Sequence, residues 1–154
     1  MHIDIVKSMA FAKGNFKPHG HIEILGEGQL VTSHLTGPFN LEGLQAMHQA
    51  RIAVLRDVPM ETPWVVMVVC HVSVMMVPES VDLQRQQLIE IFSQCARPPR
   101  AYAWVATGEV EGFDFMAPTY IANFAAAGVS MRTFREPVLA ERWLMDQLRD
   151  VTQS

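Results

Sequence analysis

The sequence predicts an α/β fold with a mostly parallel sheet of about five strands, an N-terminal β-hairpin and four helices packed on the sheet. Strand-like and helix-like segments alternate after residue 21, and glycine or proline residues separate them. Residues 64–70 and 101–107 are almost continuously apolar, as strands are when helices cover both of their faces. Alternation of this kind requires right-handed crossovers between parallel strands.

Residues 22–35 are expected to form the hairpin, because their apolar runs flank Gly26-Glu27-Gly28 and glycine supplies the positive φ of tight turns. Residues 1–20 are expected to be an irregular N-terminal segment, with a short strand at 3–6 as an alternative. The strand expected at 129–134 alternates between polar and apolar residues. One face of this strand is therefore expected to be exposed to solvent, which places the strand near an edge of the sheet.

Apolar residues at helical spacing predict four helices. Asn40 is a suitable N-cap for the first helix, and Gly128 is placed at the C-terminal end of the third as its cap. Pro118 is compatible with the third helix only in its first turn. The expected helices cover residues 41–58, 80–95, 114–127 and 136–148.

The composition favours one domain that covers residues 1–154. Hydrophobic residues make up 49% of the chain and charged residues 18%, which excludes the disordered class. The formal net charge is −4 and the basic residues form no cluster, so nucleic acid is not expected as a partner. No apolar run approaches the roughly 18 residues of a membrane-spanning helix, so no integral membrane segment is expected.

The cysteines and the first residues predict a cytoplasmic protein. Cys70 and Cys95 lie in apolar segments without CxxC spacing, which is typical of buried thiols in a reducing compartment. Residues 1–7 lack the basic and apolar regions of a signal peptide. Both observations favour the cytoplasm over a secreted, disulfide-bonded protein.

The order hairpin, helix, strand, helix, strand, helix, strand, helix resembles the STAS fold, in particular the SpoIIAA-like branch of STAS/SEC14-type proteins. Gly37-Pro38-Phe39-Asn40 opens the first helix after the hairpin. Residues 134–144 resemble that family's ending, in which the last strand continues into a helix with a Trp-Leu pair, here Trp143-Leu144. The resemblance covers about residues 21–148 and implies a bacterial regulatory module.

The sequence departs from this family at the phosphorylation site. Anti-anti-sigma STAS proteins carry a phosphorylatable serine in an Asp-Ser-Ser-Gly-like run after the central strand. Residues 70–80 lack that run, although Ser73 and Ser80 lie within them. The phosphorylation switch is therefore not carried over. SEC14-like relatives bind lipids, whereas this chain is short for an enclosed lipid cavity.

Ligands of parallel α/β sheets bind at the carboxyl ends of the strands, where this sequence places the loops 37–40, 71–80, 107–114 and 135–136. Met75 and Met76 are notable because methionine adapts to irregular apolar partners. They indicate a docking surface or an apolar pocket, or else they fill the core. The residues expected to bind a ligand are Phe39, Asn40, His71, Ser73, Met75, Met76, Thr107 and Glu109.

No catalytic site, metal site or cofactor is expected, but two alternatives stay open. The first alternative is a catalytic site in which Cys70 and His71 form the reactive pair and Glu109 adds a carboxylate. Against it, neighbouring strand residues point to opposite faces. A zinc site without HExxH or CxxC would use His19, His21 and His34.

The function that the sequence favours is a non-catalytic STAS-like binding or regulatory module. We expect it to be a homodimer that engages a protein partner or a small apolar molecule through residues 72–78. The alternative is a small cytoplasmic enzyme with a site near Cys70, His71 and Glu109. Fold class by itself does not decide between the two, because one fold hosts many functions.

Overall fold

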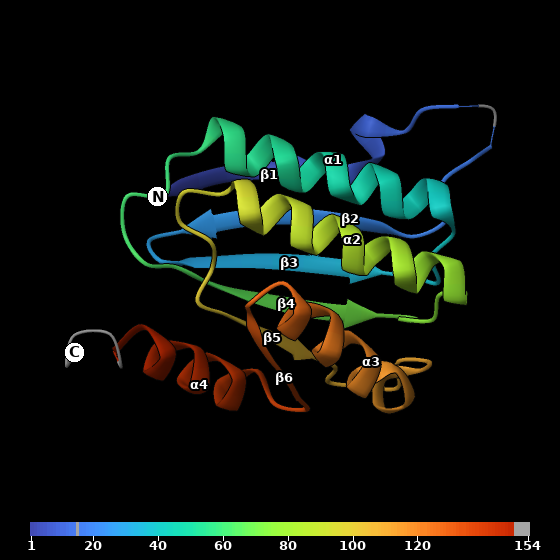
Figure 1. Ribbon diagram of the computed structural model, residues 1–154. Coiled ribbons are helices and arrows are strands. Elements are labelled where there is room, and N and C mark those ends of the chain that lie inside the picture. The colour runs from blue at the N-terminus through green and yellow to red at the C-terminus, as the bar shows by residue number, and fades with distance from the viewer. Residues whose placement is uncertain (15, 150–154) are drawn as a thin grey trace.

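The computed structural model describes residues 1–14 and 16–149. Six strands in these residues form one sheet in the order β1-β2-β3-β4-β5-β6 (Figure 1). Strands β1, β2 and β3 are antiparallel neighbours, whereas β3, β4, β5 and β6 run parallel. The strands are β1 (His2–Lys7), β2 (His21–Glu27), β3 (Leu30–Thr36), β4 (Val65–His71), β5 (Ala101–Val105) and β6 (Ser130–Phe134).

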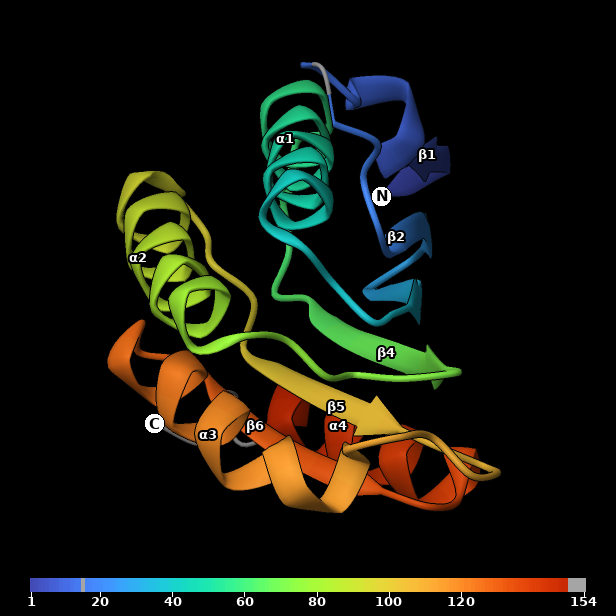
Figure 2. The ribbon, with the colours of Figure 1, turned by 90° about the vertical axis from the view of Figure 1, so that its right-hand side faces the viewer.

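Helices lie on both faces of the sheet (Figure 2). Helices α1, α2 and α3 cover one face, and α4 packs on the other face against β4, β5 and β6. The helices are α1 (Leu41–Asp57), α2 (Pro78–Gln94), α3 (Phe113–Ala126) and α4 (Pro137–Arg149), and a 3₁₀ turn, η1 (Ser8–Phe11), follows β1. None of the helices in the described part of the chain is long and apolar enough to span a bilayer.

The predicted fold class is confirmed, with a mostly parallel sheet and four helices in the described residues, but the sheet has six strands rather than about five. The additional strand is β1, which lies in the segment expected to be irregular and pairs with β2. Ile3 is 3% exposed and belongs to the core. A register shift between Ile3 and Val6 breaks the period-two pattern, which is why the sequence signal for this strand is weak.

Local signals explain the start of α1 and the end of α3. The side-chain oxygen of Asn40 accepts hydrogen bonds from the N–H groups of Gly43 and His19, both at 2.8 Å, as expected of an N-cap. Gly128 follows α3 with a φ of 80°, the left-handed conformation of helix C-termini. Pro118 lies inside α3, beyond the first turn to which it was expected to be confined, at the cost of one helical hydrogen bond.

The larger core lies between the sheet and helices α1, α2 and α3. At its centre the rings of Tyr102 and Phe124 have centroids 4.5 Å apart, and those of Trp104 and Tyr120 are 5.0 Å apart. The Tyr120 hydroxyl also donates a hydrogen bond to the carbonyl oxygen of Val74. Aromatic pairs contribute about 0.5–1.5 kcal/mol beyond the area that they bury, so this cluster fixes α3 on β5.

A smaller core lies beneath α4. Alternate residues of a strand point to opposite faces, so Val65, Ala103 and Val105 lie on the α4 side while their neighbours join the larger core. Ala140 and Leu144 of α4 are completely buried against them. Strand β6 forms one edge of the sheet and β1 the other, and the alternating sequence of β6 predicts its edge position.

Helix α3 offers a matched test of the larger core. Phe124 is 0% exposed, whereas Phe115 on the same helix is 78% exposed. Phe124→Ala is expected to lower the free energy of unfolding by about 3–5 kcal/mol, and Phe115→Ala by about 0.5 kcal/mol or less. Urea denaturation followed by circular dichroism measures both values. Equal losses in the two variants would contradict the packing of α3 on β5.

Candidate functional site

The loops at the carboxyl ends of the parallel strands lie side by side. The loop after β3 meets the loop after β4 through a bridge between Phe39 and Met76, where the Phe39 N–H donates to the Met75 carbonyl oxygen at 3.1 Å. The loop after β4 meets the loop after β5 through Ser73 and Glu111. The fold thus brings the predicted loops together, and backbone hydrogen bonds connect them.

These loops border a broad, solvent-open hollow of about 700 Å³. Thr107 and Glu109, two of the predicted binding residues, line it together with Val72 and Arg135. The Arg135 guanidinium is already paired, because it donates to the carboxylate of Asp114 at 2.6 Å. With an exposed glutamate and a neutralised arginine, the hollow is poorly suited to an anion.

Ser73 and the two methionines hold the loops together. Ser73 is 2% exposed; its hydroxyl donates to Glu111 Oε1 at 3.2 Å and accepts from the Met75 N–H at 3.1 Å. Met76 is buried in the larger core, and Met75 is partly buried against that core. Ser80 is completely buried, so neither serine of this segment is accessible to a kinase in this conformation.

The remaining residues of this edge differ in their surroundings. Phe39 is 5% exposed and belongs to the larger core, and Asn40 caps α1. Val72 is 65% exposed and has a φ of 65°, a left-handed conformation that is costly for a β-branched residue. Such strain often accompanies functional loops, and it has no signature in the sequence.

Cys70 and His71 point to opposite faces of β4, as strand alternation predicts. Cys70 is 3% exposed in the larger core, and burial raises the pKa of its thiol to about 12, so the thiol is protonated at neutral pH. His71 is exposed, with its Nε2 atom 3.0 Å from Nδ1 of His34. The thiol and the imidazole therefore do not form a nucleophile–base pair.

His34 stacks on His71 instead of joining His19 and His21. The centroids of the stacked rings are 5.3 Å apart, and their planes differ by 16°. Among residues 1–14 and 16–149, no group of three or more His, Cys, Asp or Glu side chains is placed to hold a metal ion. The three-histidine zinc alternative is therefore not assembled.

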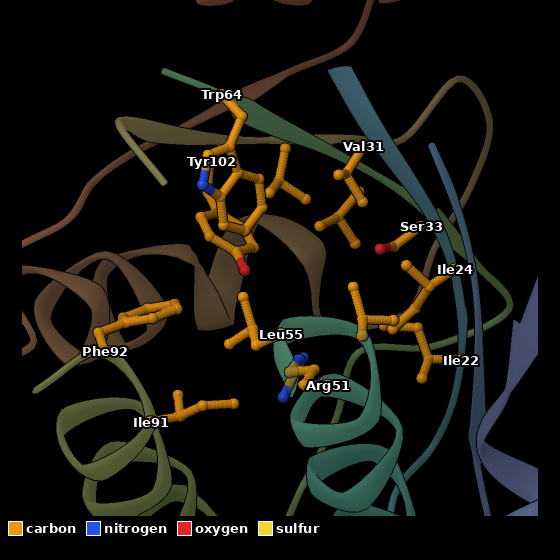
Figure 3. Close-up of a pocket in the computed structure, with 13 residues that line it drawn as sticks. Ile22, Ile24, Val31, Ser33, Arg51, Leu55, Trp64, Ile91, Phe92 and Tyr102 are labelled. Carbon is orange, nitrogen blue, oxygen red and sulfur yellow. The ribbon is translucent and has the colours of Figure 1, made fainter. Parts of the chain in front are cut away.

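A small cavity of about 30 Å³ lies between the sheet and helices α1 and α2 (Figure 3). Val31, Val66 and Tyr102 form one row of its wall across neighbouring strands. They lie near the amino ends of β3, β4 and β5, at the opposite end of the sheet from the predicted loops. The apolar wall consists of Ile22, Ile24, Val31, Val54, Leu55, Trp64, Val66, Val68, Ile91 and Phe92.

Three polar side chains, those of Ser33, Arg51 and Tyr102, complete the wall and point toward the cavity in Figure 3. Ser33 is 4% exposed and Tyr102 is 6% exposed. Within the described residues, the three side chains form no hydrogen bond or ion pair with the protein. Buried polar groups are normally paired, and the fully buried side-chain atoms without a partner in the described residues are Ser80 Oγ, Gln87 Oε1 and Trp104 Nε1. The polar groups of Ser33, Arg51 and Tyr102 differ from these because they share one cavity.

The sequence prediction missed this cavity because it placed the site at the other end of the sheet. One signal was available: Arg51 lies four residues after Met47 and four before Leu55, on the apolar stripe of the helix. A charged residue at such a position lies beside the core, and Arg51 is partly buried there. Ser33, inside an otherwise apolar strand face, carries a similar but weaker signal.

The two cysteines allow a labelling test of the Cys70–His71 geometry. Because burial raises the pKa of the Cys70 thiol to about 12, an aromatic disulfide reagent is expected to label the partly exposed Cys95 in the folded protein. Cys70 is expected to react when urea unfolds the chain. Mass spectrometry of labelled peptides, with Cys95→Ser as the control, separates the sites. Fast labelling of Cys70 in the folded protein would contradict the geometry.

Comparisons with protein-family models, with curated proteins and with solved structures found no match to this chain. The functional assignment therefore rests on the geometry of the residues described above.

Proposed function

We propose that this chain is a non-catalytic, cytoplasmic binding module of the STAS type that holds a small apolar molecule in the cavity beneath helices α1 and α2. The observation that carries the proposal is the composition of the cavity wall, which is mostly aliphatic and aromatic with a few inward polar groups. Small-molecule sites have this composition, whereas ordinary protein interiors are closely packed.

A surface groove gives a small molecule a route to the cavity. The groove, of about 350 Å³, lies between the C-terminal parts of α1 and α2. Leu55 and Ile91 line both the groove and the cavity, so they form the partition between the two spaces. A cavity of about 30 Å³ is too small by itself for such a molecule, so the proposed binding requires these two side chains to rotate and the ligand to occupy both spaces.

The order of elements from β2 to α4 supports the STAS-type assignment, because a hairpin is followed by helices alternating with parallel strands. A regulatory role would require a protein partner. Val72 and Val77, at the two ends of loop 72–78, are 65% and 52% exposed and provide apolar surface for that partner. For a homodimer, the exposed Ile5 and Leu25 on the neighbouring strands β1 and β2 are the apolar surface that a second copy would cover.

1-Octanol, an uncharged apolar probe, tests the cavity. It is expected to bind one site and to raise the midpoint of urea unfolding, because it binds the folded state. Val54→Phe places a ring in the cavity and abolishes binding, whereas Val138→Phe, at a position on α4 that is 67% exposed, leaves binding unchanged. Calorimetry and NMR shifts of the wall residues measure both effects. Failure of the wild-type protein to bind the probe would refute the proposal.

Native mass spectrometry of the protein purified from its own host tests the same proposal without a chosen probe. A ligand held in the cavity is expected to add the mass of one small organic molecule, and Val54→Phe is expected to remove that mass. An added mass that persists in Val54→Phe would place the ligand elsewhere on the molecule.

A further inference from the structure

Arg51 carries a positive charge for which the described residues provide no counter-ion. Its electrostatic neighbours are Tyr102 and His48. Burial, followed by the charge of Arg51, lowers the pKa of His48, and burial raises the pKa of Tyr102 to about 12. Both neighbours are therefore uncharged at neutral pH. Arginine stays protonated in proteins, so the charge beside the cavity is not balanced.

Ser33 and Tyr102 add two uncharged hydroxyl groups to the same space. Both side chains are more than nine-tenths buried and unpaired, with exposed fractions of 4% and 6%. The high pKa of Tyr102 keeps its hydroxyl protonated, so that it acts as a hydrogen-bond donor. A guanidinium and two hydroxyls thus converge on one apolar cavity from α1, β3 and β5 (Figure 3).

We propose that the ligand is an apolar carboxylic acid bound as its anion, with the carboxylate held by Arg51, Tyr102 and Ser33 and the tail on the aliphatic and aromatic wall. This inference rests on the proposed function and names its ligand class. A carboxylate is planar and pairs with guanidinium through two parallel hydrogen bonds. One arginine balances one negative charge, which favours a carboxylate over a doubly charged phosphate.

Water does not replace such a ligand. A space of about 30 Å³ admits a few water molecules, which can satisfy the hydroxyls. Water does not neutralise the guanidinium of Arg51, which is only partly exposed, and a charge with little water around it and no partner is costly. The carboxylate both supplies the missing charge and accepts hydrogen bonds from all three groups. Its tail reaches the outer groove past Leu55 and Ile91, which line both spaces.

The test compares octanoate with 1-octanol, which have the same tail length and differ in the charge of the head. Isothermal titration calorimetry at about pH 7.5, where a carboxylic acid is ionised, gives both dissociation constants. Wild-type protein is expected to bind octanoate about tenfold or more tightly than octanol, as charged hydrogen bonds predict. Arg51→Met is expected to abolish this preference while octanol still binds. Arg85→Met, on the exposed side of α2, is the control and keeps the preference.

Tyr102→Phe provides a second variant that keeps the ring and therefore the packing. It is expected to weaken octanoate binding by about tenfold or more, the effect of one hydrogen bond to a charged group, and to leave octanol binding unchanged. A change of equal size for both probes would mean that the hydroxyl does not contact the carboxylate, and would overturn its assigned role.

Failure of the inference is distinguishable from failure of the proposed function. Equal affinity of the wild-type protein for octanoate and octanol overturns the carboxylate and leaves the apolar cavity site intact. Binding of neither probe overturns both. A preference for octanoate that survives in Arg51→Met overturns the assignment of the charge to Arg51.

Discussion

Burial of β4 and β5 on both faces is the constraint on which the rest of the structure depends. Val66 and Val68 of β4 point into the larger core, while Val65 points into the smaller core under α4. Each fully buried aliphatic side chain contributes about 1.5–3 kcal/mol, so both faces must be covered by helices. The chain satisfies this requirement with α1, α2 and α3 on one face and α4 on the other.

The cavity follows from how that coverage is arranged. Helix α1 packs on β2 and on α2, and Trp64, which precedes β4, closes part of the space between the helices and the sheet. The Trp64 Nε1–H donates to the carbonyl oxygen of Arg97 at 2.8 Å, so the indole is held in place from outside the cavity. Arg51 reaches the space from α1 and Ser33 from β3, which places polar atoms where packing is otherwise apolar.

The two ends of the sheet therefore have different chemistry. At the carboxyl end, Ser73 and Glu111 connect neighbouring loops, and Arg135 is paired with Asp114. These polar groups already have partners within the protein, although the buried Ser80 Oγ has none among the described residues. Near the amino end, Arg51 and two hydroxyls face a cavity without such partners. Since unpaired buried polar groups are the ones that a ligand can satisfy, the second end is the better candidate site, even though parallel sheets generally bind ligands at the first.

The sequence by itself determined the fold class, the four helices, the edge position of β6 and the cap at Asn40, because hydrophobic period and turn chemistry are local properties. It also predicted that Cys70 and His71 point apart. Only the tertiary structure decided that β1 joins the sheet, since its pairing with β2 depends on a register shift. Only the tertiary structure also brings Ser33, Arg51 and Tyr102 to one cavity. These residues come from separate elements, and the distance between such elements depends on packing rather than on a local sequence pattern.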